Sequence, residues 1–135
     1  MVKTYIAQTL VGDSLVKKLL ITLLLISPFS FADWGDVYYC QMTSYVVTDV
    51  DGTVTQYKQE KFKFKIDEAK KSIVFGKAGY FNNSEQPLVL SSSPSIKEWR
   101  ASDFYSTLKF EQGKFLYVSA ILFMTTSITA DCDKF

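Results

Sequence analysis

The six residues 61–66, KFKFKI, alternate charged and apolar side chains without interruption. Because successive side chains of a β-strand point to opposite faces, this spacing directs the two phenylalanines and the isoleucine toward a core and the lysines toward solvent. A polar stretch, 67–71, follows, and residues 72–75 return with apolar side chains two positions apart. The segment therefore predicts a half-buried antiparallel β-hairpin.

The same period of two recurs later in the chain. Residues 104–110 alternate, a polar turn at 111–113 follows, and a long strand begins at Lys114. Almost every residue between Phe115 and Met124 is apolar. Such a run predicts a strand that is central in the sheet or covered on both faces, because an exposed apolar edge would invite aggregation.

A first strand is predicted over residues 37–47, followed by a turn at 49–53 and a return at 54–57. The loop 76–86 contains glycine and asparagine, and we expect it to cap one end of the fold. The alternation of the first strand places Tyr39 and Tyr45 on one face, and Tyr38, Cys40 and Met42 on the other.

Two further segments have weaker signals. Residues 87–90 begin with proline, which is tolerated at the start of a strand, and they predict a short edge strand. Residues 95–102 predict a short helix, because SIKE has the form of a capping box. Together these elements predict an all-β fold: a single antiparallel barrel, closed or nearly closed, or a flattened sandwich, with about six to eight strands.

Residues 16–32, VKKLLITLLLISPFSFA, have the pattern of a signal peptide. Two lysines precede an apolar run, and the run ends in a small-x-small sequence at Ala32. An uncleaved membrane anchor and a buried helix are the alternatives, but the run is short and Pro28 interrupts it. We therefore expect residues 1–32 to be a signal peptide with an N-terminal extension over 1–15. Residues 33–135 would then be a periplasmic or secreted β domain with no stable transmembrane segment.

The charge of the expected domain is nearly balanced. Residues 1–32 hold three of the 15 basic and one of the 14 acidic residues, which leaves 12 basic and 13 acidic groups in the remainder. The absence of a basic excess argues against a nucleic-acid partner.

Cys40 and Cys132 lie near the two ends of the expected domain. An even pair of cysteines in an exported chain predicts a disulfide. Closing a loop of about 90 residues would stabilise the fold by roughly 4–5 kcal/mol in the loop-entropy model. The bond would also bring the first and last strands together. A redox or metal-binding role is disfavoured, because the chain has neither a CxxC spacing nor a histidine.

Residues 46–54, VVTDVDGTV, resemble the first motif of the haloacid dehalogenase phosphatases. That resemblance implies Asp49 as the nucleophile and Asp51 as the general acid and base, with magnesium beside them. The family needs a parallel sheet with crossover helices, whereas the rest of this chain predicts hairpins. The favoured interpretation is therefore a hairpin turn with Gly52 at its tip. A calcium loop is a third alternative, but it would need more oxygen ligands than these.

Two sets of residues are candidate binding sites. Four lysines form a candidate face for an anionic partner, although they equally suit the solvated side of a hairpin. Four tyrosines are candidate ligand-lining residues at the mouth of a barrel, although such residues more often fill a core. We predict no catalytic, cofactor-binding or metal-binding residues. The lysines are Lys58, Lys61, Lys63 and Lys65, and the tyrosines are Tyr39, Tyr45, Tyr105 and Tyr117.

The layout of the chain resembles short secreted β-rich proteins of unknown function from marine bacteria and their phages. The residues that carry the resemblance are the leader, the tyrosine–cysteine first strand, FKFKI at 62–66, GKFLY at 113–117 and the terminal CDKF. This resemblance implies no activity. A disulfide between terminal strands is also similar to the small barrel inhibitors of C-type lysozyme. The chain lacks their Ser-Gly and lysine-bearing loop motif, so that likeness concerns architecture.

The function that the sequence favours is non-enzymatic binding of a small apolar ligand, a protein or an envelope component. An envelope-associated structural protein without a ligand is the alternative. An aspartate-nucleophile phosphatase is the remote third. Enzymatic function in general is disfavoured, because the chain has no histidine to serve as a general base.

Overall fold

A computed structural model describes residues 32–89 and 98–135. The expected leader, up to residue 31, lies outside the described residues, so its role as a signal peptide stays a prediction. The described residues form one compact unit. No helix in the described part of the chain is long and apolar enough to cross a membrane.

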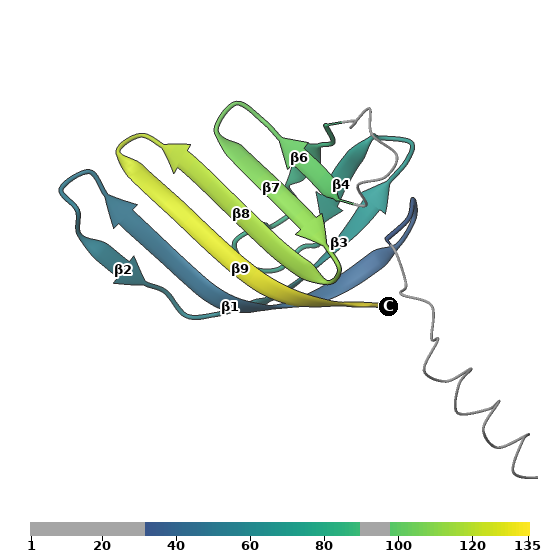
Figure 1. Ribbon diagram of the computed structural model, residues 1–135, viewed down its shortest axis with the longest axis horizontal. Helices are drawn as coiled ribbons and strands as arrows, with labels where there is room; N and C mark the ends of the chain where they lie inside the picture. The colour runs from purple at the N-terminus through teal and green to yellow at the C-terminus, as the bar shows by residue number, and fades with distance from the viewer. Residues whose placement is uncertain (1–31, 90–97) are drawn as a thin grey trace, which may run out of the picture. The chain divides into compact units, whose positions relative to one another are not determined.

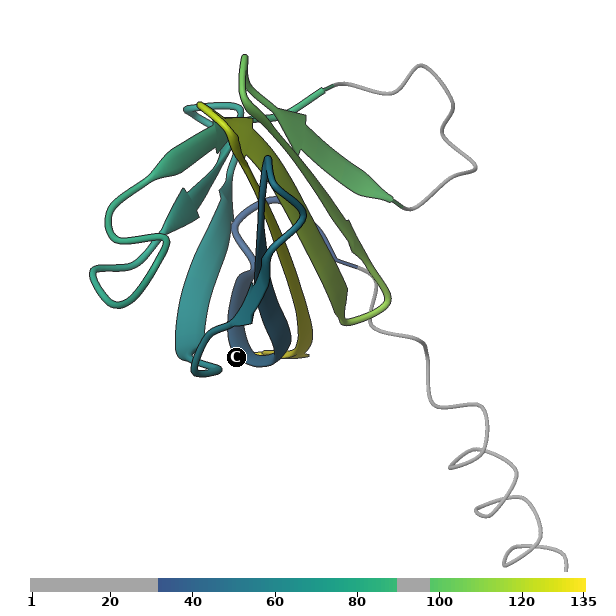
Figure 2. The ribbon, with the colours of Figure 1, turned by 90° about the vertical axis from the view of Figure 1, so that its left-hand side faces the viewer.

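The described residues form nine β-strands and no helix, and every strand pair is antiparallel. Eight strands follow one another around a nearly closed barrel in the order β5-β4-β3-β1-β9-β8-β7-β6, while β2 pairs with β1 beside this path (Figures 1 and 2). The predicted all-β barrel is therefore confirmed. The strands are β1 (Val37–Asp49), β2 (Val54–Gln56), β3 (Lys61–Asp67), β4 (Ser72–Phe75), β5 (Glu85–Pro87), β6 (Trp99–Ser102), β7 (Ser106–Glu111), β8 (Lys114–Ile121) and β9 (Met124–Lys134).

Aromatic rings fill the centre of the barrel. The alternation of β3 buries Phe62, Phe64 and Ile66, none of which is more than 5% exposed. The Phe62 ring centroid lies 4.9 Å from that of Phe115 on β8 and 6.1 Å from that of Phe75 on β4. Burying each such side chain contributes roughly 1.5–3 kcal/mol. The predicted hairpin of residues 61–66 and 72–75 is confirmed as β3 and β4.

A β-bulge in β1 changes which of its side chains face the core. The pairing with β9 runs in register from Tyr38 to Met42 and resumes at Ser44 one residue out of step. Because an extra residue shifts the alternation by one position, Tyr39 faces outward while Tyr45 packs against the core. The prediction that these two tyrosines share a face is therefore wrong, since it assumed an unbroken period of two.

The disulfide between Cys40 and Cys132 is confirmed. The two residues are directly opposite each other on β1 and β9, and their Cα atoms are 4.0 Å apart. Both cysteines are buried in the core. The bond therefore joins β1 and β9, the first and last strands in the sequence, which are neighbours in the barrel.

Strand β8 lies between β9 and β7, as expected for a central strand. Its inward residues Phe115 and Tyr117 are buried, but Leu116 and Val118 on the other face are 39% and 38% exposed. Of the two predicted alternatives, the central position is therefore confirmed, and β8 is covered on one face only. A single sheet that curls around its own core has only one inner face, so the outward aliphatic side chains of β8 meet solvent.

The barrel closes between β5 and β6 through one bridge and a small polar network. Leu88 pairs with Ala101 across the gap. The buried Gln86 donates from Nε2 to Ser106 Oγ at 3.0 Å and to Asp103 Oδ2 at 3.1 Å. Buried polar groups need hydrogen-bond partners, and these contacts supply them between β5 and β6, where no continuous ladder of backbone hydrogen bonds forms.

Two predicted elements differ from the structure. The edge strand expected at 87–90 is instead β5, which covers Glu85–Pro87. The helix expected over 95–102 is wrong in its described part, because residues 99–102 form β6 along β7. Residues 95–97 lie outside the described residues. Pairing with β7 outweighs the local capping signal, which is weak in so short a segment.

The turns that flank β7 also correct the expected strand over 104–110. This strand begins only at Ser106, and Phe104 lies in the β6–β7 turn, where it is 91% exposed. Asp103 Oδ1 accepts hydrogen bonds from the backbone N–H groups of Tyr105 and Ser106, both at 2.8 Å, which holds this turn. The turn predicted at 111–113 is confirmed between β7 and β8.

Candidate functional site

The structure separates the four tyrosines that the sequence suggested as ligand-lining residues. Tyr39 faces outward from β1, and Tyr105 is exposed in the β6–β7 turn. Tyr117 is buried, and Tyr45 packs against the core. The four therefore do not line one common site, and two of them belong to the packed interior.

Tyr45 and Tyr117 instead meet Tyr80, which comes from the loop after β4. The Tyr80 ring centroid lies 5.4 Å from that of Tyr45 and 5.7 Å from that of Tyr117. Burial raises the pKa of Tyr117 to about 12, and a side-chain hydrogen bond with Tyr80 acts in the same direction. Burial also raises the pKa of Tyr45. These phenols are therefore neutral at physiological pH and suit a packed core.

The loop after β4 reaches the core through Tyr80 and Phe81. Phe81 is buried, and its ring stacks on Phe75 with the centroids 4.3 Å apart. The backbone N–H of Tyr80 donates to Glu60 Oε2 at 2.9 Å, which ties the loop to the connection before β3. The predicted capping loop therefore contributes buried aromatic rings to the interior.

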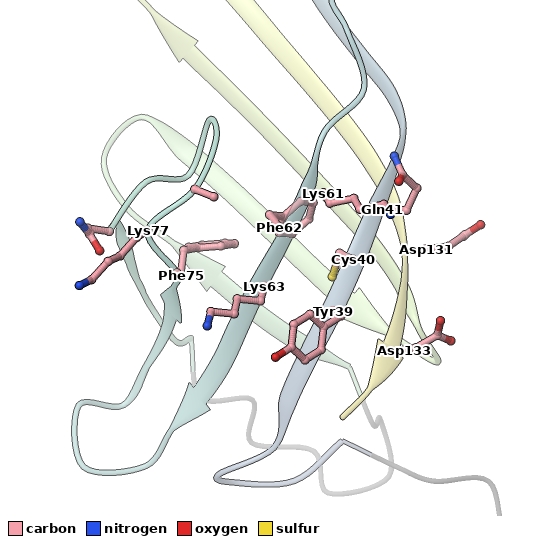
Figure 3. A pocket seen from close by; sticks show the side chains of 13 residues that line it. Tyr39, Cys40, Gln41, Lys61, Phe62, Lys63, Phe75, Lys77, Asp131 and Asp133 are labelled. Carbon is pink, nitrogen blue, oxygen red and sulfur yellow. The ribbon is translucent and has the colours of Figure 1, made fainter.

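An open groove of about 1030 Å³ crosses the outer surface of β3, β1 and β9 (Figure 3). It lies where β4 ends at Phe75 and the chain leaves the edge of β3. In Figure 3, Tyr39 lies in the middle, with lysines toward the β4 side and carboxylates on β9. The charged residues of the groove are Lys61, Lys63, Lys77, Asp131 and Asp133.

The local sequence explains why lysines line this groove. Because Phe62 and Phe64 point into the core, Lys61 and Lys63 on either side of Phe62 must point outward. Gly76 makes room for one of them, since a Cβ atom at this position would lie 2.8 Å from two carbons of the Lys63 side chain. The Gly76 N–H also donates to the Lys63 carbonyl at 3.0 Å, which fixes the loop against β3.

The lysines of this groove form no ion pair with a described carboxylate, although Asp133 lines the same groove. Lys114 Nζ lies 2.6 Å from Asp131 Oδ1 and compensates one of the two carboxylates of the groove. No described carboxylate forms an ion pair with the outward lysines of β3 or with the groove lysine after β4. We call these four residues the lysine face: Lys61, Lys63, Lys65 and Lys77.

The lysine face differs from the predicted set by one residue. Lys58 lies in the exposed connection between β2 and β3 and does not line the groove. Lys65 continues the outward row of β3 beyond the groove. Lys77 belongs to the same lysine-rich stretch of sequence, residues 58–77, but it was not one of the four predicted site residues, because no period relates a loop residue to a strand. Only the turn of the chain after β4 brings it beside β3.

Asp49 and Asp51 lie in the hairpin turn between β1 and β2, which is the arrangement that the sequence favoured. The Asp49 N–H donates to the Thr53 carbonyl, and the Gly52 N–H donates to the Asp49 carbonyl, both at 2.9 Å. A backbone hydrogen bond from Thr53 lowers the pKa of Asp51. The described residues hold no cluster of three or more His, Cys, Asp or Glu side chains suited to a metal ion.

Comparison of the chain with known proteins finds no matching family model, no matching curated protein and no matching solved structure.

Proposed function

We propose that the chain is an exported, non-enzymatic binding domain that holds an anionic component of the cell envelope against its lysine face. The observation that carries this proposal is the contrast between the aromatic-filled interior and the open groove, whose lysines form no ion pair with a described carboxylate. A binding site of this kind attracts anions by charge and excludes partners of like charge.

The filled interior favours an outer surface over an internal ligand site. Ring contacts of 4.3–6.2 Å connect Phe62, Phe64, Phe75, Phe81 and Phe115 through the middle of the barrel. A barrel that holds a small apolar ligand has a cavity between its inward side chains. An external partner is therefore the better-supported form of the binding function.

The buried disulfide supports the export part of the proposal. Disulfides persist in oxidising compartments, such as the periplasm and the extracellular space. The bond joins Cys40 and Cys132 across 92 positions of sequence, so the fold depends on a compartment that maintains it.

The direct test measures binding of a phosphate-bearing envelope polysaccharide from which the acyl chains have been removed. We expect binding that weakens as salt is added, because exposed charges are screened. The triple variant Lys61→Gln, Lys63→Gln, Lys77→Gln should bind roughly tenfold more weakly. Isothermal titration calorimetry at two salt concentrations measures both effects.

Lys109→Gln provides the matched control. Lys109 is also an exposed lysine, but it lies on β7 and faces Glu98 at 3.7 Å. Its substitution removes the same charge away from the lysine face, so binding should change less than twofold. Equal binding by the parent chain and the triple variant would contradict the proposal.

The alternative functions have their own tests. A small apolar molecule retained by the purified protein in native mass spectrometry would favour an internal ligand site. Absence of binding to any envelope component would favour a structural role. Release of phosphate from p-nitrophenyl phosphate with magnesium, abolished by Asp49→Asn, would instead identify an aspartate-nucleophile phosphatase.

A further inference from the structure

Exposed apolar side chains gather at the tips of three hairpins, on a part of the surface separate from the lysine face. The β1–β2, β6–β7 and β8–β9 hairpins each present two such side chains, and the most exposed are Phe104 at 91%, Leu122 at 89%, Val50 at 77% and Phe123 at 75%. We call this set the apolar tips: Val50, Val54, Phe104, Tyr105, Leu122 and Phe123.

The three turns lie at the same end of the barrel. β7, β8, β9 and β1 are consecutive in the sheet, and the three tips lie side by side in Figure 1. The Ala120 N–H donates to the Tyr105 carbonyl at 2.9 Å, which joins the β6–β7 turn to the end of β8. Asp49 pairs with Met124, which places the β1–β2 turn beside the β8–β9 turn. The apolar tips therefore form one row.

Leu122 occupies a backbone conformation that disfavours leucine. It is the first of two residues between the paired Ile121 and Met124, and its φ is +57°. Glycine, asparagine and aspartate dominate such positions. Four described non-glycine residues have positive φ, and Leu122 is the only apolar one; the others are Lys71, Asn83 and Gln112. A strained, bulky and exposed side chain is a signal of function, because packing does not require it.

The charge around the apolar tips favours a zwitterionic lipid surface over an anionic one. Residues 115–130 contain no charged side chain, and the three turns contain no lysine or arginine. The charged residues at these hairpin ends are Asp49, which ends β1, and the turn residues Asp51 and Asp103. An anionic lipid surface would be repelled by these carboxylates, whereas a zwitterionic surface would not.

The size of the row argues against a second protein. A standard protein–protein interface takes about 20–30 residues from each partner, and its apolar anchors need matching pockets. The apolar tips are six residues at separate protruding turns. A lipid layer accepts each protruding side chain without a complementary shape.

We propose that the apolar tips insert into the interfacial layer of a zwitterionic lipid bilayer and hold the barrel there end-on. Leu122 and Phe123 enter the acyl region, with Phe104 and Val50 on either side. Tyr105, whose ring is apolar and whose hydroxyl is polar, suits the level of the headgroups. This surface is distinct from the lysine face, so either surface can function without the other.

The test uses vesicles of phosphatidylcholine and phosphatidylethanolamine with the purified chain, in which residues 1–31 are the same for every variant. Leu122→Asn should weaken vesicle binding by roughly tenfold or more, as expected for an apolar side chain that leaves lipid. The fold should not suffer, because asparagine tolerates positive φ. Phe135→Asn is the matched control, since Phe135 is 86% exposed at the opposite end of the chain's last strand. It should change binding less than twofold.

A fluorescent reporter tests which end of the barrel enters the bilayer. In Phe123→Trp, the new indole should shift its emission to the blue and be quenched by brominated lipid. The natural Trp34 and Trp99, which pack on each other with ring centroids 5.0 Å apart, report on another part of the barrel. Their emission in the parent chain should be quenched less.

Several results would overturn the proposal. Vesicle binding by Leu122→Asn equal to that of the parent chain, or an equal loss in Phe135→Asn, would show that the tips do not bind lipid. Quenching of the natural tryptophans but not of Trp at position 123 would reverse the orientation. Tighter binding to vesicles with added anionic lipid by the triple variant Lys61→Gln, Lys63→Gln, Lys77→Gln, which lacks most of the lysine face, would exclude the zwitterionic surface. None of these results bears on polysaccharide binding by the lysine face.

Discussion

The lysine face and the apolar tips belong to the same barrel, yet their outer surfaces have opposite chemistry. On β3, charged side chains alternate with buried phenylalanines, so the outward positions are cations. On β8 the inward Phe115 and Tyr117 are equally buried, but after Lys114 the outward positions are aliphatic, and both residues of the β8–β9 turn are exposed and apolar.

This difference shows that folding constrains the two faces of the sheet unequally. Both regions fill the interior with large apolar side chains, because burying apolar surface stabilises the fold in every strand of the barrel. The outer positions contribute little to the core, so lysine on β3 and leucine on β8 are both compatible with the barrel. The outer surface is therefore where this protein can specify a partner.

The largest effect is expected from a substitution on the inward face of β3, the strand that carries most of the lysine face. Phe64→Ala should lower the free energy of unfolding by about 3–5 kcal/mol, because Phe64 is 1% exposed and its removal leaves a cavity. The adjacent Lys63→Ala should change it by less than about 0.5 kcal/mol. Urea denaturation followed by circular dichroism measures both. Similar losses in the two variants would mean that the outward lysine has a structural role.

Removing the disulfide tests how the lysine-bearing end is fastened. The double variant Cys40→Ser, Cys132→Ser should lose about 2–5 kcal/mol of unfolding free energy, because the unfolded chain is no longer closed into a loop. Hydrogen exchange should increase most where β1 meets the end of β9, and less in the β8–β9 turn. Uniform loss of protection would contradict this contrast.

Acidification tests the β6–β7 turn beneath the apolar tips. Partial burial tends to raise the pKa of Asp103, but hydrogen bonds from Tyr105 and Ser106 outweigh it and lower the pKa. The carboxylate therefore stabilises the fold fully above its unfolded pKa of about 3.9, and this stabilisation is lost as the pH falls through the lower folded value.

Asp103→Asn should accordingly cost roughly 1 kcal/mol at pH 7, a modest value because the carboxylate is partly exposed to solvent. The difference between the variant and the parent chain should shrink in acid. Denaturation at pH 7 and at pH 2 measures it, and a difference that is the same at both values would show that the ionised carboxylate is not the stabilising group.

The smallest effects are expected from substitutions in two hairpin turns, the β8–β9 turn and the β7–β8 turn. Leu122→Gly should raise the free energy of unfolding by roughly 0.5–1 kcal/mol, because glycine removes the cost of positive φ. Gly113→Ala in the β7–β8 turn should lower it, since φ is +75° and the new Cβ would lie 2.9 Å from the Cys132 carbonyl oxygen. Thermal melts of the two variants should shift in opposite directions. A lower melting temperature for Leu122→Gly would remove the argument from strain.

Local alternation allowed prediction of much of the fold. The period of two identified β3, β4 and the inward face of β7, because a half-buried strand imposes that period on the sequence. The same reasoning failed at Tyr45, where the bulge shifts the alternation, and at residues 99–102, where pairing with β7 outweighs a helix signal. Both failures depend on a neighbouring strand that lies far away in the sequence.

The candidate sites were less predictable than the fold. Lys61 and Lys63 were identifiable because their positions follow from the strand period. Lys77 and the two groove aspartates join them only through the loop after β4 and the pairing of β9 with β1. The three hairpins with apolar tips are separated along the chain, and only strand order places them in one row.

The sequence by itself determined an antiparallel all-β fold, either a barrel or a flattened sandwich, together with its central hairpin and the pairing of Cys40 with Cys132, because alternation and cysteine count are properties of the local chain and its chemistry. The tertiary structure alone decided that the interior is filled, that the lysines border a groove and that Leu122 and Phe104 share one end. Those outcomes depend on register, on the bulge and on closure of the barrel, which arise from contacts between strands distant in sequence.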